Sequence, residues 1–322
     1  MTDVESSRNT LRARARGAVL GSAVGDALGA AYEFGTRAVG PDGPEMLGGG
    51  LGDFAPGEWT DDTTMAWAVL QAAADHDDLR SDAALTQVAR AFRRWFESGP
   101  ADIGHQTRVV LAEAGPAPTC AVLTATAADL HARTGRSAGN GSLMRTAPVA
   151  LRYLDDPVGL VEAARRTSAL THHDLQAQDA CALWSLAARH AIVEGELALR
   201  PGLGLLGEEA AATWGAIIDE AEQHEPDRFT PNGWVVTALQ AAWSAIVHTP
   251  VPTDDPKHHL VAALDTAIRV GDDTDTVAAI AGGLLGARWG EEAVPERWRR
   301  MLHGYPGLTA DDLLTLVDRV LD

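Results

Sequence analysis

The chain contains only two cysteines, Cys120 and Cys181, among its 322 residues. A disulfide framework or a zinc site normally needs more thiols, so we expect neither and predict a reducing, cytoplasmic location. The first ten residues are polar and include acidic side chains, which is not how a secretory signal begins. No run of about 20 apolar residues is free of polar breaks, so the sequence predicts no transmembrane helix.

Positive charge is also scarce. The chain has 26 Lys and Arg residues against 45 Asp and Glu residues, and its formal net charge is −19 at pH 7. Such an excess of negative charge repels anionic membranes and the phosphate backbone of nucleic acid. We therefore expect no membrane partner and no non-specific binding to nucleic acid.

Clean alternation of apolar and polar residues, the signal of half-buried strands, is missing as well, whereas helical periodicity is frequent. The pattern predicts an all-α protein that forms a single domain over residues 1–322. The expected helices cover residues 11–31, 63–75, 83–97, 121–132, 158–168, 174–194, 208–223, 235–247, 258–270, 276–289, 295–302 and 310–321.

The first expected helix carries glycine at every fourth position, at Gly17, Gly21, Gly25 and Gly29. This spacing places all four on one helix face. Each glycine costs roughly 1 kcal/mol of helix propensity relative to alanine, so close packing must compensate. We expect a tightly packed central helix, on which a buried Asp26 caps or orients an adjacent loop and is not itself a metal ligand.

Two aspartate-rich segments, each followed by an expected helix, are the strongest chemical signal. They read Trp59-Thr60-Asp61-Asp62-Thr63-Thr64 and Gly271-Asp272-Asp273-Thr274-Asp275-Thr276. Either segment alone is explained by helix capping, since Asp and Thr are favoured N-cap residues. Together they offer five carboxylates and several hydroxyls, which are hard oxygen ligands suited to Mg²⁺ or Mn²⁺. If the fold joins them, they form a site for two divalent cations.

Five motifs in order resemble the ADP-ribosylglycohydrolase family, which includes the dinitrogenase reductase-activating glycohydrolases. They are Gly25-Asp26-Ala27-Leu28-Gly29 with Glu33, Thr60-Asp61-Asp62-Thr63, Gly139-Asn140-Gly141-Ser142-Leu143-Met144-Arg145, Thr171-His172-His173, and Asp273-Thr274-Asp275-Thr276. The resemblance covers roughly residues 14–290. It implies a compact multi-helix orthogonal bundle with a binuclear Mg²⁺ or Mn²⁺ centre in a cleft.

The resemblance also implies roles for individual residues. The implied metal ligands are Thr60, Asp61, Asp62, Asp273, Asp275 and Thr276. The implied catalytic residues are Glu33, Asp61 and Asp62, of which Glu33 either ligates or gates the site. The implied substrate-binding residues are Gly135, Arg136, Ser137, Ala138, Gly139, Asn140, Gly141 and His172, and backbone amides of such a loop form a nest for phosphate.

Other positions carry weaker expectations. Asp272 stands where the family usually has a second glycine, and Asp tolerates a positive φ better than most residues. Ala138 stands where some relatives have an aromatic that stacks on adenine, so this protein must stack the base elsewhere, bind it more weakly or recognise a different nucleotide end. We expect Asp102-Ile103-Gly104 to be structural and His258-His259 to be solvated, and Arg145 either neutralises a phosphate or pairs with an acid.

The function implied is metal-dependent hydrolysis of the glycosidic bond between ADP-ribose and an acceptor, by attack of water without a covalent intermediate. The partner is an ADP-ribosylated protein or a small ADP-ribosyl compound, and nucleic acid only as a modified substrate. Arginine, serine, a nucleobase and an acyl ester remain open as acceptors. Two alternatives remain: a non-catalytic or immunity-type ADP-ribose-binding protein of the same fold, and a dimetal phosphoesterase.

Overall fold

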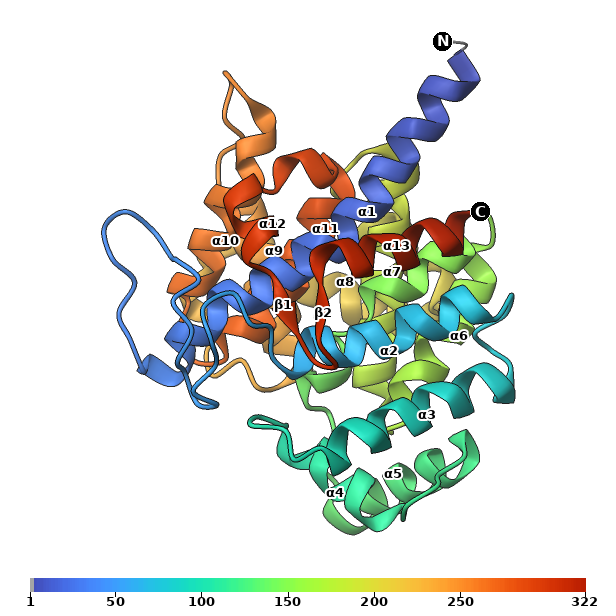
Figure 1. Cartoon of the computed structure of the whole chain (residues 1–322). Helices are drawn as coiled ribbons and strands as arrows, with labels where there is room; N and C mark the ends of the chain where they lie inside the picture. Colours follow the sequence, from blue (N-terminus) through green and yellow to red (C-terminus); the bar gives the residue numbers. More distant parts are fainter. Residues whose placement is uncertain (1–2) are drawn as a thin grey trace.

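The computed structural model describes residues 3–322 and is dominated by helices, which confirms the all-α prediction (Figure 1). The α-helices are α1 (Asp3–Gly29), α2 (Asp61–Asp75), α3 (Asp82–Glu97), α4 (His105–Glu113), α5 (Cys120–Thr134), α6 (Pro157–Ala169), α7 (Leu175–Glu194), α8 (Glu208–Gln223), α9 (Val235–His248), α10 (His259–Arg269), α11 (Thr274–Trp289), α12 (Glu296–Met301) and α13 (Ala310–Leu321).

Short 3₁₀ helices and one hairpin complete the chain. The 3₁₀ helices are η1 (Ala30–Gly35), η2 (Asn140–Ser142), η3 (Ala147–Tyr153), η4 (Arg200–Leu205), η5 (Pro226–Arg228), η6 (Pro256–His258) and η7 (Glu291–Ala293). Two-residue strands β1 (His303–Gly304) and β2 (Leu308–Thr309) pair antiparallel, with Gly304 opposite Leu308. The sequence pattern had not predicted this hairpin, because two residues are too few to show a period.

The glycine-rich face of α1 packs directly against α11, and the two helices run side by side through the molecule (Figure 1). A Cβ atom added at Gly21 would lie 2.3 Å from the Gly282 carbonyl oxygen, and one added at Gly25 would lie 2.1 Å from that of Ala278. At Gly29 the nearest atom is Cα of Asp275, at 2.4 Å. Only glycine allows this approach. The contact places the beginning of α11 against the end of α1.

Two differences from the predicted helices affect the site. Helix α2 begins at Asp61 and α11 begins at Thr274, so Asp61, Asp62 and Asp275 lie in the first helical turns and Asp273 is an N-cap. Helix α4 had not been predicted. It has only nine residues, and Gly104 at its N-cap makes no side-chain capping bond, so the usual starting signal is missing.

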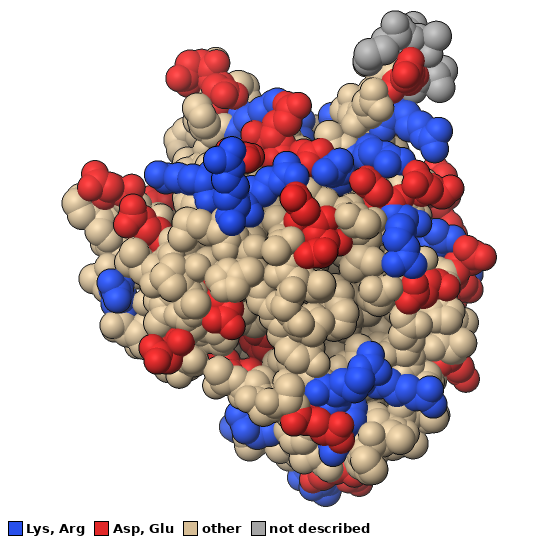
Figure 2. Space-filling view, in the orientation of Figure 1, with Lys and Arg blue, Asp and Glu red and all other residues tan. Residues whose placement is uncertain are grey.

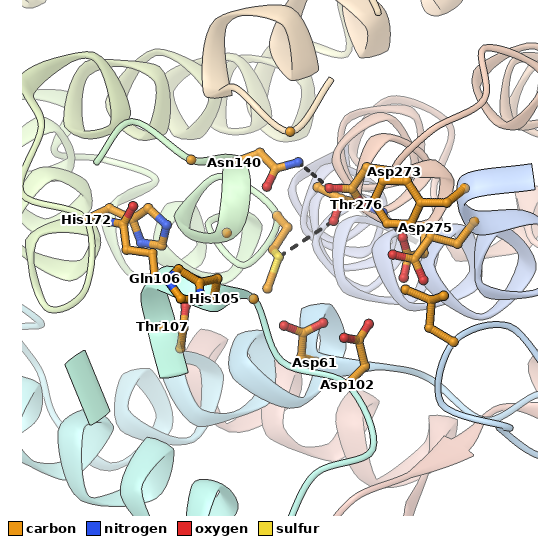
Figure 3. Close-up of a pocket in the computed structure, with 18 residues that line it drawn as sticks. Asp61, Asp102, His105, Gln106, Thr107, Asn140, His172, Asp273, Asp275 and Thr276 are labelled. Atoms are coloured by element: carbon orange, nitrogen blue, oxygen red, sulfur yellow. Dashed lines mark hydrogen bonds between the residues drawn. The ribbon is translucent and has the colours of Figure 1, made fainter. Parts of the chain in front are cut away.

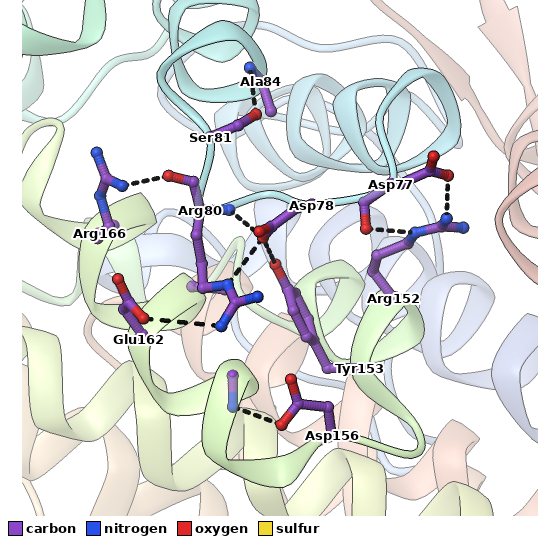
Figure 4. A network of polar contacts seen from close by, with 12 residues as sticks. Asp77, Asp78, Arg80, Ser81, Ala84, Arg152, Tyr153, Asp156, Glu162 and Arg166 are labelled. Carbon is purple, nitrogen blue, oxygen red and sulfur yellow. Dashed lines mark hydrogen bonds and ion pairs between the residues drawn. The ribbon is translucent and has the colours of Figure 1, made fainter.

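A polar network holds the connection between α2 and α3 (Figure 4). The Asp78 carboxylate accepts hydrogen bonds from Tyr153 Oη at 2.7 Å and from Arg80 Nε at 2.9 Å. Arg166 of α6 donates to the Arg80 carbonyl. These bonds tie the connection to η3 and α6, and they thereby support the far end of the helix that carries Asp61.

The charged side chains on the face shown in Figure 2 are interspersed acidic and basic residues, without a continuous basic surface. Many form ion pairs, such as Arg299 with Asp311 at 2.7 Å. Within residues 3–322, no helix combines the length and the hydropathy needed to cross a membrane.

Candidate active site

One cavity of about 260 Å³ brings together residues from distant parts of the sequence (Figure 3). Acidic side chains gather at one end, and two amides, two histidines and glycines at the other (Figure 3). The lining residues are Glu33, Phe34, Leu51, Asp61, Asp102, Gly104, His105, Gln106, Thr107, Gly139, Asn140, Gly141, Met144, His172, Gly233, Asp273, Asp275 and Thr276.

The acidic end of the cavity is built from the first turns of α2 and α11. Asp61 and Asp62 begin α2, and Asp275 lies in the first turn of α11; all three are buried. Helix N-termini carry unsatisfied amide groups and a partial positive charge, which stabilise nearby carboxylates. The fold thus joins the two aspartate-rich segments.

Asp26 holds the first aspartate-rich segment in place from behind. Its Oδ1 accepts from the Thr60 amide at 2.9 Å, and its Oδ2 accepts from the Thr63 amide at 2.9 Å and from Thr63 Oγ1 at 2.5 Å. These hydrogen bonds occupy both oxygens and agree with the expectation that Asp26 orients a loop. Asp26 is therefore a positioning residue for Asp61 and Asp62.

The crowded carboxylates resist ionisation. Burial, together with the negative charges of Asp102 and Asp26, raises the pKa of Asp61 to about 8. Burial and the neighbouring acids also hold the pKa values of Asp62 and Asp275 well above the usual range. Low dielectric and like charge both favour the neutral acid. A bound cation would remove this conflict.

The donor set fits divalent cations. Asp26, Asp62 and Asp275 offer oxygens within 4.8 Å of one another, and so do Glu33, Asp273 and Asp275. Asp62 Oδ1 is buried and accepts no hydrogen bond from residues 3–322. Thr60 Oγ1 lies 3.3 Å from Asp62 Oδ2 and 3.5 Å from Asp275 Oδ2. An unpartnered buried carboxylate oxygen is costly, so this oxygen is suited to a hard cation.

Glu33 reaches the acidic end through a break in the helix. Its ψ of 134° interrupts η1, and Phe34 follows with a φ of 45°. The Phe34 amide donates to the Asp272 carbonyl at 2.7 Å, which fastens this break to the second aspartate-rich segment. Asp272 itself adopts a φ of 58°. Burial and the charges of Asp102 and Asp273 raise the pKa of Glu33 to about 9.

Asn232, which sequence reasoning had missed, connects the two ends of the cavity. Its Oδ1 accepts from the Asp273 amide at 2.9 Å, and its Nδ2 donates to the Gly271 carbonyl at 3.0 Å. Asn140 Nδ2 donates to Asp273 Oδ2 at 2.7 Å and to the Asn232 carbonyl at 3.0 Å. Asn232 is fully buried, but its Pro-Asn-Gly context resembles an ordinary turn, so no sequence signal distinguished it.

The neutral end is organised around His172. Thr171 Oγ1 lies 2.8 Å from His172 Nδ1 and accepts a hydrogen bond of 2.8 Å from Arg145 Nη2. Arginine can only donate, so the Thr171 proton is available to Nδ1. This arrangement favours the tautomer with its proton on Nε2, the atom that faces Gly139 and Gly141. Burial and the Arg145 charge lower the pKa of His172 to about 3.

Arg145 itself differs from both expectations. It is fully buried away from the cavity lining, stacks over the Phe92 ring at 4.7 Å, and makes no ion pair with an acid among residues 3–322. Its hydrogen bonds go to Thr171, to the Thr167 carbonyl and to Met65 Sδ. It therefore neither contacts a phosphate position in the cavity nor pairs with a carboxylate.

The predicted substrate loop divides into two parts. Gly139, Asn140 and Gly141 line the cavity, whereas Gly135, Arg136, Ser137 and Ala138 do not. Gly135 ends α5 with a φ of 61°. The Ser137 carbonyl accepts from Gln106 Nε2 at 3.1 Å, and the same amide donates to the Thr171 carbonyl at 2.8 Å. Gln106, from the unpredicted helix α4, thus positions this loop against the segment carrying His172.

Two further positions differ from the expectations. Asp102 lies beside Asp61 at the acidic end of the cavity (Figure 3), and is not only a structural element. His259 is buried, and its Nε2 lies 3.0 Å from the Thr249 carbonyl, so the expectation of a solvated pair was wrong for this residue. Its partners are supplied by α9, by the residue after α9 and by Trp289 of α11, which the local sequence does not reveal.

Comparison with known proteins agrees with the family resemblance seen in the sequence motifs. The family model described as ADP-ribosylglycohydrolase matches residues 7–322. The chain belongs to the ADP-ribosylglycohydrolase family. It is 32% identical over 307 residues to ADP-ribosylarginine hydrolase Tri1 of Pseudomonas putida (strain GB-1), covering 88% of this chain and 73% of that protein.

Two more comparisons extend this result. The chain is 31% identical over 300 residues to the ADP-ribosyl-[dinitrogen reductase] glycohydrolase of Rhodospirillum rubrum, covering 88% of each. A solved structure described as "ADP-ribosylglycohydrolase-related protein complex" matches 97% of this chain and 98% of its own, with a TM-score of 0.70 and 28% identity. These relatives are named as hydrolases, and the protein is accordingly a hydrolase of this family.

Proposed function

We propose that the protein removes ADP-ribose from ADP-ribosylated arginine by hydrolysis, using two Mg²⁺ or Mn²⁺ ions. The observation that carries this proposal is the buried acidic end of the cavity, with Asp62 Oδ1 left unpartnered. Arginine is favoured as the acceptor because relatives above 30% identity include an ADP-ribosylarginine hydrolase. The Asp102 carboxyl group, which lines the cavity, also suits a cationic guanidinium group.

Two bound cations would supply an activated water and would neutralise the clustered carboxylates. The cation ligands in this proposal are Thr60, Asp61, Asp62, Asp273, Asp275 and Thr276, as the resemblance implies. Asp26 holds the first segment in position and Asn232 holds the second. The chain therefore supplies fixed donors that need little rearrangement when a cation binds.

The reaction joins a water oxygen to C1″ of the distal ribose and breaks the bond from C1″ to the guanidinium nitrogen. Of Asp61 and Asp62, Asp61 lines the cavity and is placed to orient the water and accept its proton. Glu33, which lines the same end of the cavity, would deliver a proton to the departing nitrogen. At the neutral end, Gly139, Gly141 and His172 line the cavity and would face the nucleotide.

The test uses arginine-, serine- and DNA-linked ADP-ribose, each incubated with Mg²⁺, with Mn²⁺ or with EDTA, and measures the released products. The proposal expects intact ADP-ribose from the arginine linkage and none with EDTA. Phosphate or AMP as the product would instead identify a phosphoesterase. ADP-ribose binding without release from any linkage, with cations bound, would identify a non-catalytic or immunity-type binding protein.

A further inference from the structure

A separate cavity, of about 610 Å³, lies between the N-terminal part of α1, η6 and the end of α11. It shares no lining residue with the candidate active site. Its lining includes three cationic side chains, Arg14, Lys257 and Arg288, and two acidic ones, Asp255 and Glu292. Cationic side chains are thus in excess there, although the whole chain has a net charge of −19. A hollow with this charge balance attracts anions.

The two acidic side chains of this cavity already have partners. Lys257 Nζ forms an ion pair with Glu292, and the Lys257 amide donates to Asp255 Oδ1 at 3.1 Å. His258 Nε2 also lies 3.7 Å from Asp255 Oδ2. Neither Arg14 nor Arg288 forms an ion pair with residues 3–322. The two guanidinium groups are therefore the charges of the cavity that no carboxylate balances.

Arg288 is held in position by stacking and not by hydrogen bonds. Its guanidinium carbon lies 4.2 Å from the centre of the Trp289 ring. That ring is fixed in turn, because Trp289 Nε1 donates to His259 Nδ1 at 3.2 Å, and His259 Nε2 lies 3.0 Å from the Thr249 carbonyl. Arg288 makes no hydrogen bond to residues 3–322, so its five N–H groups are free to bind a ligand. A guanidinium held in this way is preorganised for an anion.

Arg14 brings a second guanidinium group close to Arg288. Its Nη1 donates to the Ile192 carbonyl at 3.2 Å, near the end of α7. Helix C-termini favour nearby positive charge, which accounts for the presence of both arginines but not for their free N–H groups. Burial and the Arg14 charge lower the pKa of Arg288, and the Glu196 charge opposes this shift. An anion between the two guanidinium groups would remove their repulsion.

We propose that this cavity binds an anionic small molecule, through a phosphate or carboxylate group held between Arg14 and Arg288. Guanidinium groups bind both of these groups through paired hydrogen bonds. The site is distinct from the acidic end of the active site, since Asp275 and Arg288 lie about 20 Å apart along α11, at about 1.5 Å per residue. A second ligand-binding site at this place does not depend on the proposed function.

The experiment is calorimetric titration of the full-length protein with inorganic phosphate and with malonate, at constant ionic strength in chloride. We expect saturable binding of at least one of them. Arg288→Gln should weaken this binding about tenfold or more, because charge-assisted hydrogen bonds are lost. Arg14→Gln should have the same effect and replaces Arg288→Gln if that variant folds poorly. Arg288→Lys should restore the affinity only in part, since an ammonium group lacks the planar fork of donors.

Arg297→Gln is the matched control. Arg297 also lies over a neighbouring tryptophan ring, at 5.4 Å from the centre of Trp298, but it is outside the cavity lining. This variant should bind both probes as the unaltered protein does. A titration repeated with EDTA should give the same affinities, since the site uses no cation.

The relative affinities for the two probes identify the ligand class. Tighter binding of phosphate would indicate a phosphorylated ligand, and binding of malonate at least as tight would indicate a carboxylate. Failure of the unaltered protein to bind either probe would overturn the proposal. Equal affinities in Arg288→Gln, Arg14→Gln and the unaltered protein would also overturn it, as would loss of binding in EDTA. Hydrolysis should be unchanged in Arg288→Gln, so these results leave the proposed function untouched.

Discussion

The two ends of the cavity satisfy buried polar groups in opposite ways. At the neutral end, His172 receives hydrogen-bonding partners from the chain itself, through Thr171 and Arg145. At the acidic end, several carboxylates lie together and Asp62 Oδ1 has no partner within residues 3–322. At the neutral end the chain supplies a partner for His172 Nδ1, although Arg145 Nε is left without one, whereas at the acidic end the proposed cations would balance the charge of the carboxylates. This comparison suggests that only the acidic end depends on an added ion.

The largest expected effect is at the acidic end. Asp275→Asn removes a carboxylate that lies within 4.8 Å of oxygens of both Asp62 and Asp273. We expect hydrolysis to fall by at least about 1000-fold, because cation catalysis contributes several kcal/mol. The metal-free variant should be more stable than the metal-free unaltered protein, since one buried like charge is gone. Product assays and denaturant unfolding measure both effects, and normal turnover with full cation binding would contradict the ligand assignment.

Removing the cation should have the next largest effect. With Mn²⁺ at about 100 times its dissociation constant, the folded state gains about 2.7 kcal/mol relative to the metal-free protein. This corresponds to a rise in melting temperature of several degrees, which EDTA should reverse. His172→Gln should show the same rise, because the change lies at the neutral end. A rise of equal size in Asp275→Asn would show that Mn²⁺ stabilises the protein elsewhere.

At the neutral end, the expected effect is a pH dependence of the free energy of unfolding, caused by His172. Burial lowers the pKa of His172 to about 3, so the unfolded chain takes up the proton first as the pH falls below about 6.5. Stability is thus present above pH 6.5 and is lost progressively toward pH 3, by up to about 1.4 kcal/mol per pH unit. Denaturant unfolding at several pH values should show a smaller slope in His172→Gln. Identical slopes in the two proteins would exclude a buried neutral His172.

The smallest expected effect concerns Arg145, which acts on the cavity through Thr171. We expect nitrogen NMR shifts of His172 to show the proton on Nε2, and Arg145→Met to allow both tautomers. The loss of this one fixed donor should weaken ADP-ribose binding by about threefold to tenfold. Thr171→Val tests the same link if Arg145→Met folds poorly. An unchanged tautomer in both variants would mean that Arg145 has only a packing role against Phe92.

The sequence predicted most helices and both aspartate-rich segments, because helix periodicity and clustered acids are local signals. It could not show why the segments meet. That depends on the close approach of α1 and α11 at Gly21 and Gly25, which the glycine spacing predicted without naming the partner helix. Asn232 and Gln106 were missed for the same reason, since their importance comes from partners distant in sequence.

The role of Arg145 could not be predicted from its local sequence either. Its motif suggested contact with a phosphate or an acid, but the fold surrounds it with Phe92 of α3 and with Thr171 of the turn after α6. Its role therefore comes from tertiary contacts with these residues.

The most direct measurement is a titration of Mn²⁺ into metal-free protein in the presence of ADP-ribosylated arginine, counting bound ions and released ADP-ribose together. The account predicts two ions per chain and turnover that rises with their occupancy. Full turnover by protein with no bound ions would contradict the central claim that the acidic end of the cavity is a catalytic cation site.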